Sequence, residues 1–177
     1  MFRLLTLAVL CCAAPLLHGA ELPKVGDPAP AFSMQGSDGK TYKLEDFKGQ
    51  QAVIVAWFPR AFTGGCTKEC KSMKESGEQL KKFKVAYFTA STDAVDKNTE
   101  FARSLDLDYP ILSDPQGENA KAFGVYMAGR NAASRVTFVI GADGKILAVI
   151  DKVNTTSHGE DLAQLLDELK IARRSPK

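Results

Sequence analysis

Two cysteines, Cys66 and Cys70, are the residues of this chain best suited to chemistry. Cys66 ends the segment PRAFTGGC, residues 59–66, and Cys70 follows with three residues between them. A cysteine acts as a nucleophile through its thiolate, so its surroundings must favour the anion. Thr63 is placed to cap a helix that begins at Gly64, which puts Cys66 at the third helical position. Unpaired backbone N–H groups and the positive end of the helix dipole lie there, so we expect this thiol to ionise more readily than a free one.

A cysteine on the apolar face of a helix is also an ordinary small core residue, so its neighbours must decide between the two interpretations. Gly64 and Gly65 let another group approach the backbone closely just before the helix. The apolar run that ends at Pro59 directs this loop to the carboxyl edge of a sheet, where open α/β folds bind their ligands. The sequence therefore predicts a pocket around Cys66.

Pro59, Thr63 and Cys66 stand as Pro-x-x-x-Thr-x-x-Cys, which resembles the active-site signature of peroxiredoxins. The resemblance continues through GDPAPAF at 26–32, YPILSDP at 109–115 and SRVTFVIGADGKI at 134–146. Within that family the chain is most similar to the Q, or bacterioferritin-comigratory, type. The resemblance implies a thioredoxin-like fold and a thiol-dependent peroxidase that reduces hydrogen peroxide and organic hydroperoxides without a cofactor or metal.

The resemblance also implies a role for each site residue. Cys66 resembles the peroxidatic cysteine, Thr63 the hydroxyl that hydrogen-bonds the peroxide and the thiolate, and Pro59 the residue that shields the sulfur from water. Arg135 resembles the active-site arginine of the family. These roles are chemically reasonable, because attack on an O–O bond needs a stabilised sulfur anion and a donor for the departing oxygen. Arginine suits this task because its guanidinium stays charged and presents several N–H groups in a fixed fork.

Cys70 is the candidate for recycling the oxidised site. Peroxide leaves a cysteine as a sulfenic acid, which a nearby thiol can condense with to form a disulfide. Residues four apart on an intact helix have β-carbons roughly 5 to 6 Å apart, whereas a disulfide needs about 3.5 to 4.5 Å. The first turn must therefore unwind for Cys66 and Cys70 to join. Relatives that resolve within this helix usually have four residues between the cysteines, but here there are three. An external or second-subunit thiol is therefore the alternative.

Three other functions compete with a peroxidase. A thioredoxin-like protein acting on disulfides uses Cys-x-x-Cys, which is one residue shorter than the spacing here. A peroxide sensor would be oxidised at Cys66 but would turn over slowly. In an inert binding domain, loss of Cys66 would lower the stability without changing any catalytic rate. We expect His158 to lie in the first exposed turn of the last helix, so a Cys-His pair of the protease type has no support. Without residues 1–20, which contain Cys11, Cys12 and His18, the chain keeps two cysteines and one histidine, and these cannot supply the four ligands of a structural zinc site.

Residues 1–20 have the pattern of a secretory signal peptide. They carry one positive charge at Arg3, an apolar run over 4–17 and no acidic residue. We expect this segment to be removed, which leaves one thioredoxin-like domain over 21–177 in the periplasm or outside the cell. Disulfides can form and persist in such a compartment.

The charge of the chain gives little reason to expect a polyanionic partner. The formal net charge is +2 and falls to +1 when Arg3 is lost with the leader. A nearly neutral domain has no electrostatic cause to hold nucleic acid or an anionic membrane. The lysine-rich stretch over 68–84 is interleaved with Glu69, Glu75 and Glu78, as on a solvated helix face. The expected partners are a peroxide and a thioredoxin-like or small-thiol reductant, and we expect a monomer or weak dimer.

The elements that must position the site follow from hydrophobic periodicity. Extended segments over 31–34 and 41–44 flank the turn at 37–40, and a buried strand spans 52–58. A helix runs from Gly64, followed by strands over 85–90 and 109–112 with a helical pattern between them. A hairpin over 135–140 and 146–150 precedes a last helix, opened by a capping box formed by Ser157 and Glu160. This order predicts an α/β, thioredoxin-like fold with a central mixed sheet flanked by helices and an N-terminal β-hairpin extension.

Overall fold

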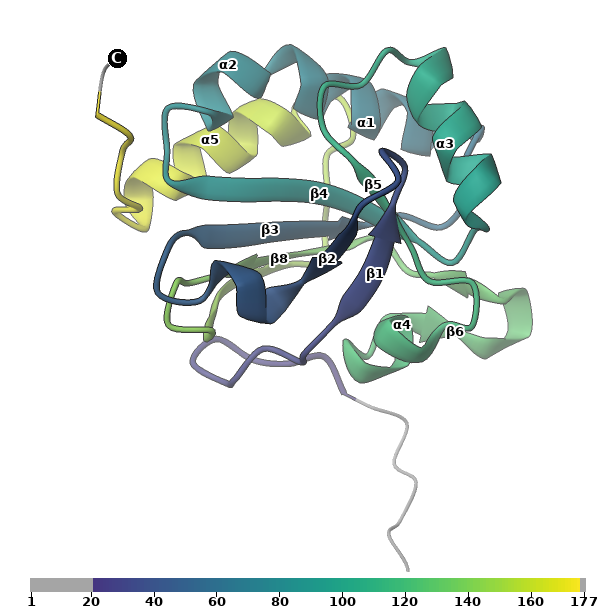
Figure 1. The fold of residues 1–177 in the computed structure, drawn as a ribbon, viewed down its shortest axis with the longest axis horizontal. Helices are drawn as coiled ribbons and strands as arrows, with labels where there is room; N and C mark the ends of the chain where they lie inside the picture. Colours follow the sequence, from purple (N-terminus) through teal and green to yellow (C-terminus); the bar gives the residue numbers. More distant parts are fainter. Residues whose placement is uncertain (1–20, 176–177) are drawn as a thin grey trace, which may run out of the picture.

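The computed structural model describes residues 21–175, so the signal peptide expected over 1–20 lies outside the described residues. A seven-stranded sheet in the order β2-β1-β5-β4-β3-β8-β9 forms the centre, and a two-stranded sheet pairs β6 with β7 (Figure 1). The strands are β1 (Ser33–Gly36), β2 (Thr41–Lys43), β3 (Ala52–Trp57), β4 (Val85–Ser91), β5 (Ile111–Ser113), β6 (Tyr126–Met127), β7 (Ala132–Ala133), β8 (Val136–Ile140) and β9 (Ile146–Ile150).

Helices cover both faces of the large sheet. The α-helices are α1 (Gly64–Glu75), α2 (Gly77–Leu80), α3 (Val95–Ser104), α4 (Glu118–Ala122) and α5 (His158–Glu168), and the 3-10 helices are η1 (Leu44–Phe47) and η2 (Ala128–Arg130). In Figure 1, α1, α2, α3 and α5 lie above the strands, and α4 lies below them. The site residues near α1 therefore belong to the upper layer.

The large sheet is mixed, as the sequence predicts. Strand β3 runs parallel to β4, and β4 runs parallel to β5. Strands β8 and β1 are antiparallel to their neighbours β3 and β5. The parallel strands β3 and β4 both end at the edge from which α1 and α3 begin, so the loops that follow them meet there.

Strand β3 is the centre of the core, and every one of its residues is buried. Val53, Val55 and Trp57 pack into the cluster on the α4 side of the sheet. Ile54 and Ala56 pack on the other side, against residues of α1, α2 and α5. An apolar run without alternation is typical of a strand covered on both faces. Burying each large apolar side chain contributes about 1.5 to 3 kcal/mol, so the strand before the site is rigidly held.

Two local predictions need correction. The first strand spans Ser33–Gly36 rather than 31–34, because it pairs on both sides and Pro28 and Pro30 upstream cannot donate to a ladder. The capping box is wrong, because no side-chain cap hydrogen bond forms at α5. Ser157 occupies the N-cap position, but its hydroxyl donates to the Asp161 carboxylate at 2.9 Å. The short elements α4, β6 and β7 have no counterpart in the predicted pattern.

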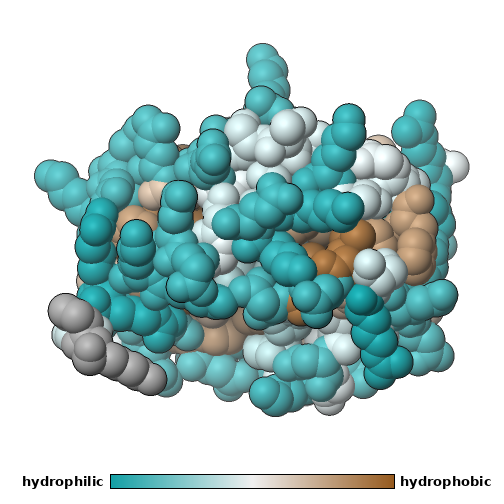
Figure 2. All heavy atoms as spheres, turned by 90° about the horizontal axis from the view of Figure 1, so that it is seen from above, coloured by the Kyte–Doolittle hydropathy of each residue, from teal (hydrophilic) through white to brown (hydrophobic). Residues whose placement is uncertain are grey.

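The face seen from above in Figure 2 is mostly hydrophilic, with a smaller hydrophobic area among the polar side chains. Among residues 21–175, the large hydrophobic residues that are exposed are Val25 and Phe62, at 66% and 49%. Within residues 21–175, none of the helices has the length and apolar character needed to cross a membrane.

Candidate active site

Cys66 lies just after the point where the chain leaves the sheet and enters α1. Strand β3 ends at Trp57, and α1 begins at Gly64, which makes Cys66 its third residue, as predicted. The first intrahelical bond runs from the N–H of Thr67 to the carbonyl of Thr63 at 2.9 Å. The N–H groups of residues 64–66 thus have no partner within the helix and make its end electropositive. The Cys66 side chain is only 1% exposed, so a water-poor niche surrounds the sulfur.

Thr63 occupies the N-cap position of α1 but does not cap it with its side chain. Its backbone is extended, and no side-chain cap hydrogen bond forms. The hydroxyl instead donates to the carbonyl of Arg60 at 3.0 Å. The predicted position is therefore right and the predicted capping bond is wrong. A hydroxyl that has already donated its proton presents its oxygen as an acceptor.

Arg135 brings a positive charge to the sulfur. Its Nη2 donates to Sγ of Cys66 at 3.3 Å, and its Nη1 donates to Oε2 of Glu69. A β-carbon on Gly65 would lie 3.2 Å from Nη2, whereas one on Gly64 would have no atom within 4 Å. Gly65 is therefore the glycine that permits a close approach, and the group that approaches is the guanidinium.

Glu69 belongs to the buried side of α1 rather than to the solvated face expected for it. Its side chain is completely buried and forms an ion pair with Arg135. A buried carboxylate requires such a partner because desolvation of an isolated charge is costly. The sequence does contain a signal for this burial, since Glu69 lies three residues after Cys66 and four residues before Met73. Those positions share one face of a helix, and a charge on an apolar face predicts a buried partner.

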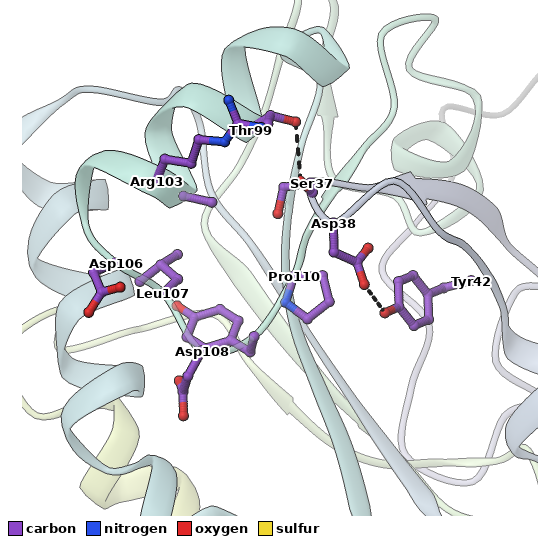
Figure 3. A pocket seen from close by; sticks show the side chains of 11 residues that line it. Ser37, Asp38, Tyr42, Thr99, Arg103, Asp106, Leu107, Asp108 and Pro110 are labelled. Atoms are coloured by element: carbon purple, nitrogen blue, oxygen red, sulfur yellow. Dashed lines mark hydrogen bonds between the residues drawn. The ribbon is translucent and has the colours of Figure 1, made fainter.

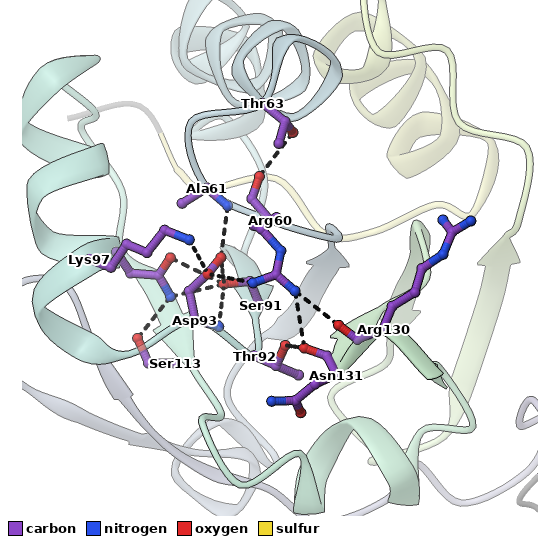
Figure 4. Close-up of polar contacts among 11 residues, drawn as sticks. Arg60, Ala61, Thr63, Ser91, Thr92, Asp93, Lys97, Ser113, Arg130 and Asn131 are labelled. Atoms are coloured by element: carbon purple, nitrogen blue, oxygen red, sulfur yellow. Dashed lines mark hydrogen bonds and ion pairs between the residues drawn. The ribbon is translucent and has the colours of Figure 1, made fainter. Parts of the chain in front are cut away.

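Asp93, two residues after the end of β4, holds the loop that precedes Cys66 (Figure 4). Its buried carboxylate accepts from the N–H of Ala61 at 2.7 Å and from Nζ of Lys97 at 2.6 Å. The Arg60 guanidinium lies 3.9 Å from the same carboxylate and donates to the carbonyl of Arg130 at 3.0 Å. The loop is thus fixed from two neighbouring segments, which sets the direction of Thr63 and of the helix start.

The chain that carries this buried cysteine and its neighbouring arginine is also similar in sequence to known proteins. A protein-family model described as the AhpC/TSA family matches residues 25–149. The chain is 36% identical over 151 residues to "Peroxiredoxin Bcp" of Escherichia coli K12, covering 82% of this chain and 96% of that protein. The chain is a peroxiredoxin of the AhpC/TSA family.

Other relatives place this peroxiredoxin in the Bcp type. The "Putative peroxiredoxin Rv2521" of Mycobacterium tuberculosis is 34% identical over 152 residues, covering 82% of this chain and 94% of its own. The crystal structure of "Peroxidoxin BcpB" from the same species superposes with a TM-score of 0.76 at 31% identity, covering 86% of this chain and 99% of that one. The thioredoxin-like peroxiredoxin fold and the thiol peroxidase class predicted from the sequence are thereby confirmed.

Cys70, the second cysteine of α1, is fully buried in the same apolar cluster as Cys66, Phe58 and Phe101. Cys66 and Cys70 are both free thiols. Burial raises the pKa of the Cys70 thiol to about 12, so this sulfur stays protonated at neutral pH in the folded helix. Its backbone is also held, because the Tyr109 hydroxyl donates to the carbonyl of Cys70 at 3.0 Å. The intact helix thus keeps Cys70 unreactive.

His158 is in the first turn of α5, as predicted, but it is not exposed. Its side chain is 2% accessible, with Nε2 2.9 Å from Oγ1 of Thr137 and 3.8 Å from Oε1 of Glu69. Burial is the main reason that the pKa of His158 falls to about 4; the positive charge of Arg135 adds to this and Asp161 opposes it. The imidazole is therefore neutral at neutral pH. It contacts the partner of Arg135, so it belongs to the surroundings of the site.

The loop before Cys66 also contains Pro59 and Phe62. Pro59 is half-buried just after the buried Phe58. Phe62 is half-exposed, adopts a left-handed backbone with φ of 65°, and packs on Phe101 with ring centroids 4.9 Å apart. A half-exposed apolar ring therefore lies two residues before the start of α1.

A hollow of about 510 Å³ lies elsewhere, between α3 and the turn joining β1 to β2 (Figure 3). Asp38, Arg103 and Asp108 are among its lining residues, and Asp38 accepts a hydrogen bond from the Tyr42 hydroxyl at 2.7 Å. Cys66 and Arg135 do not line it. The hollow is larger than a peroxide requires, and neither Cys66 nor Cys70 lines it.

Proposed function

We propose that Cys66 is the peroxidatic cysteine of this peroxiredoxin and that it reduces hydrogen peroxide and organic hydroperoxides. One observation carries the proposal: Nη2 of Arg135 lies 3.3 Å from the sulfur of a buried cysteine at a helix start. A guanidinium at that distance stabilises a thiolate and can donate to oxygen that becomes negative as the O–O bond breaks.

The geometry supports a first step in which the Cys66 thiolate is oxidised and the hydroperoxide is reduced. The Cys66 thiolate attacks one oxygen of the hydroperoxide, the O–O bond breaks, and the electron pair leaves on the second oxygen as an alkoxide or hydroxide. That leaving group takes a proton and departs as alcohol or water, and Cys66 becomes a sulfenic acid. The Thr63 oxygen is an acceptor in the resting site, so it can accept a hydrogen bond from the O–H of the hydroperoxide and orient the substrate. Arg135 stabilises the charge, and Pro59 helps to exclude water.

Organic hydroperoxides are included for two reasons. The exposed ring of Phe62 offers an apolar surface beside the helix start. A solved structure of the Xanthomonas campestris "Bacterioferritin Comigratory Protein", described in terms of its "Alkyl Peroxide Reduction Activity", superposes with a TM-score of 0.71 at 20% identity. A comparison of kcat/KM for cumene hydroperoxide and hydrogen peroxide in wild type and Phe62→Ala tests this. A loss confined to the organic substrate supports the apolar surface, and equal losses contradict it.

We further propose that Cys70 resolves the sulfenic acid after the start of α1 opens. The sulfenic acid and the Cys70 thiol condense to a disulfide with loss of water, and a thioredoxin-like or small-thiol reductant returns both thiols. Opening is required because helix geometry keeps the two β-carbons too far apart. It also exposes Cys70 to water, which removes the burial that raises its pKa.

The leader pattern over 1–20 supports export of the protein to the periplasm or beyond the cell, where we expect a monomer or weak dimer. The mass of the protein recovered from the exported fraction tests export. A chain that begins near Glu21 agrees with the proposal, whereas a full-length chain retained in the cytoplasm contradicts it.

Two single variants test the chemistry. Cys66→Ser should abolish peroxide consumption in the presence of thioredoxin and its reductase. Cys70→Ser should take up one oxygen atom per equivalent of peroxide, seen by intact mass, and then stop unless a small thiol is supplied. Normal cycling of Cys70→Ser with thioredoxin would show that an outside thiol resolves Cys66. Peroxide consumption by Cys66→Ser would refute the assignment of the peroxidatic residue.

A further inference from the structure

A buried polar group of three residues lies behind the Arg135 guanidinium: Glu69, His158 and Thr137. Glu69 uses Oε2 to pair with Arg135, but its Oε1 has no hydrogen-bond partner within residues 21–175. Nε2 of His158 lies 3.8 Å from that unpartnered oxygen. A buried carboxylate oxygen without a partner loses the hydration it had in water, so a polar neighbour matters there.

Thr137 connects this histidine to the segment that carries Arg135. Its hydroxyl oxygen is 2.9 Å from Nε2 of His158, and both side chains are buried. Thr137 follows Arg135 by two residues, and both side chains face the packing between α1 and α5, because Arg135 pairs with Glu69 of α1 and Thr137 contacts His158 of α5. An Nε2–H that donates to Thr137 also presents its positive end near Oε1 of Glu69.

Close packing of α5 on α1 fixes the position of His158. The N–H of Gly159 donates to Oγ of Ser72 in α1 at 3.0 Å. A β-carbon on Gly159 would lie 2.3 Å from the backbone oxygen of Ser72, so no larger residue fits without moving one helix. The first turn of α5 therefore has little freedom, and the imidazole is held against Glu69.

The charge state of His158 suits a supporting role. The charged groups near it are Glu69 from α1, Arg135 from the residue before β8 and Asp161 from α5. Burial keeps the imidazole neutral at neutral pH. A neutral ring can orient the carboxylate as a dipole without competing with Arg135 for its negative charge.

We propose that His158 is a positioning residue for the peroxidase reaction: together with Thr137 it holds the Glu69 carboxylate in the orientation that directs Arg135 at the Cys66 sulfur. This inference rests on the proposed roles of Cys66 and Arg135. His158 acts only through Glu69, because its ring contacts that carboxylate and Thr137 rather than the reacting sulfur.

The test uses variants in a Cys70→Ser background, so that only oxidation of Cys66 is followed. His158→Leu removes the N–H group, His158→Gln keeps an amide donor, and Gln164→Leu on the exposed side of α5 serves as a matched control. The measured quantities are the second-order rate of Cys66 oxidation by hydrogen peroxide, from intact mass, and the rate of Cys66 alkylation by iodoacetamide. We expect His158→Leu to slow both reactions by about tenfold and His158→Gln by about threefold or less. Gln164→Leu should slow neither.

A double-mutant cycle tests whether His158 affects the rate through Glu69. In a Glu69→Gln background, His158→Leu should cause no further loss, because the group it positions is already changed. A loss of the same size in both backgrounds, or no loss in a folded His158→Leu protein, overturns the inference. If His158→Leu does not fold, Thr137→Val carries the same test at nearly constant volume. Peroxide consumption by Cys66→Ser would instead refute the proposed function itself, so the two failures are distinguishable.

Discussion

The first and second turns of α1 each hold a buried cysteine, but they differ in what surrounds the sulfur. At the first turn, free backbone N–H groups and the Arg135 guanidinium face Cys66. At the second turn, Cys70 lies in an apolar cluster, and burial raises its pKa to about 12. Both side chains are nearly inaccessible, so exposure does not distinguish them. What distinguishes the two buried thiols is therefore the set of charged and polar groups beside each sulfur.

The contrast between the two turns should largely disappear when Arg135 is removed. Arg135→Met takes away the cation beside Cys66, and we expect the rate of Cys66 oxidation to fall roughly 100-fold to 1,000-fold. Stopped-flow measurement with hydrogen peroxide checks this, and Arg103→Met on α3 is the matched control. Because Glu69 would be left buried without its partner, Arg135→Met with Glu69→Gln should restore stability without restoring the rate. A small loss of rate would mean that the helix start alone activates the sulfur.

Lowering the pH should destabilise the folded protein through His158, the buried histidine beside Glu69. The pKa of His158 is lowered from 6.5 to about 4 by folding, so the unfolded chain binds more protons between these values. The free energy of unfolding should therefore fall as the pH drops through this window, by up to about 3 kcal/mol. Urea unfolding at several pH values measures this. His158→Gln should flatten the dependence, and an unchanged slope in that variant would contradict the burial-induced shift.

Gly65 tests how closely Arg135 must approach the first turn. A β-carbon there would meet Nη2 at 3.2 Å, so Gly65→Ala should displace the guanidinium slightly and slow Cys66 oxidation by about tenfold. The same change should raise the free energy of unfolding by up to about 1 kcal/mol, since alanine favours helix. Gly64→Ala is the matched control, because it meets no atom and should add stability alone. Equal rates for the two variants would show that the close approach is unimportant.

Tyr109 tests what keeps the second turn closed. Tyr109→Phe removes the hydrogen bond to the carbonyl of Cys70, which contributes about 1 kcal/mol, so opening and disulfide formation should become about fivefold faster. The rate of disulfide formation after one equivalent of peroxide, followed by quenched mass spectrometry, measures this. Tyr87→Phe is the matched control, because the Tyr87 hydroxyl is buried without a partner among residues 21–175. Equal rates in both variants would mean that Tyr109 does not limit opening.

The parts of the molecule that can be predicted are those encoded by local pattern. The uninterrupted apolar run of β3 predicts a strand buried on both faces, and the spacing of Thr63 and Cys66 predicts the helix start. Arg135 can be placed only through the family resemblance, because it lies 69 residues from Cys66.

The residues that local pattern misplaces depend on contacts between distant segments. The alternation of charges over 68–84 groups Glu69 with solvated side chains, although its helical position lies on the buried face. The expectation of an exposed His158 is wrong, because the docking of α5 on α1 through Gly159 and Ser72 leaves no periodic signal. Asp93 supports the loop from the end of another strand, which only the folded sheet brings near.

Phe62 has a strained backbone conformation as well as an apolar surface. A non-glycine residue with φ of 65° is disfavoured by roughly 1 kcal/mol relative to an ordinary conformation. That cost would be recovered if the loop before Cys66 relaxed, and its recovery would lower the energy needed to begin the opening of α1 that we propose. The resting enzyme therefore stores a small strain one residue before the N-cap of α1, and releasing it would favour the opening that we propose for recycling through Cys70.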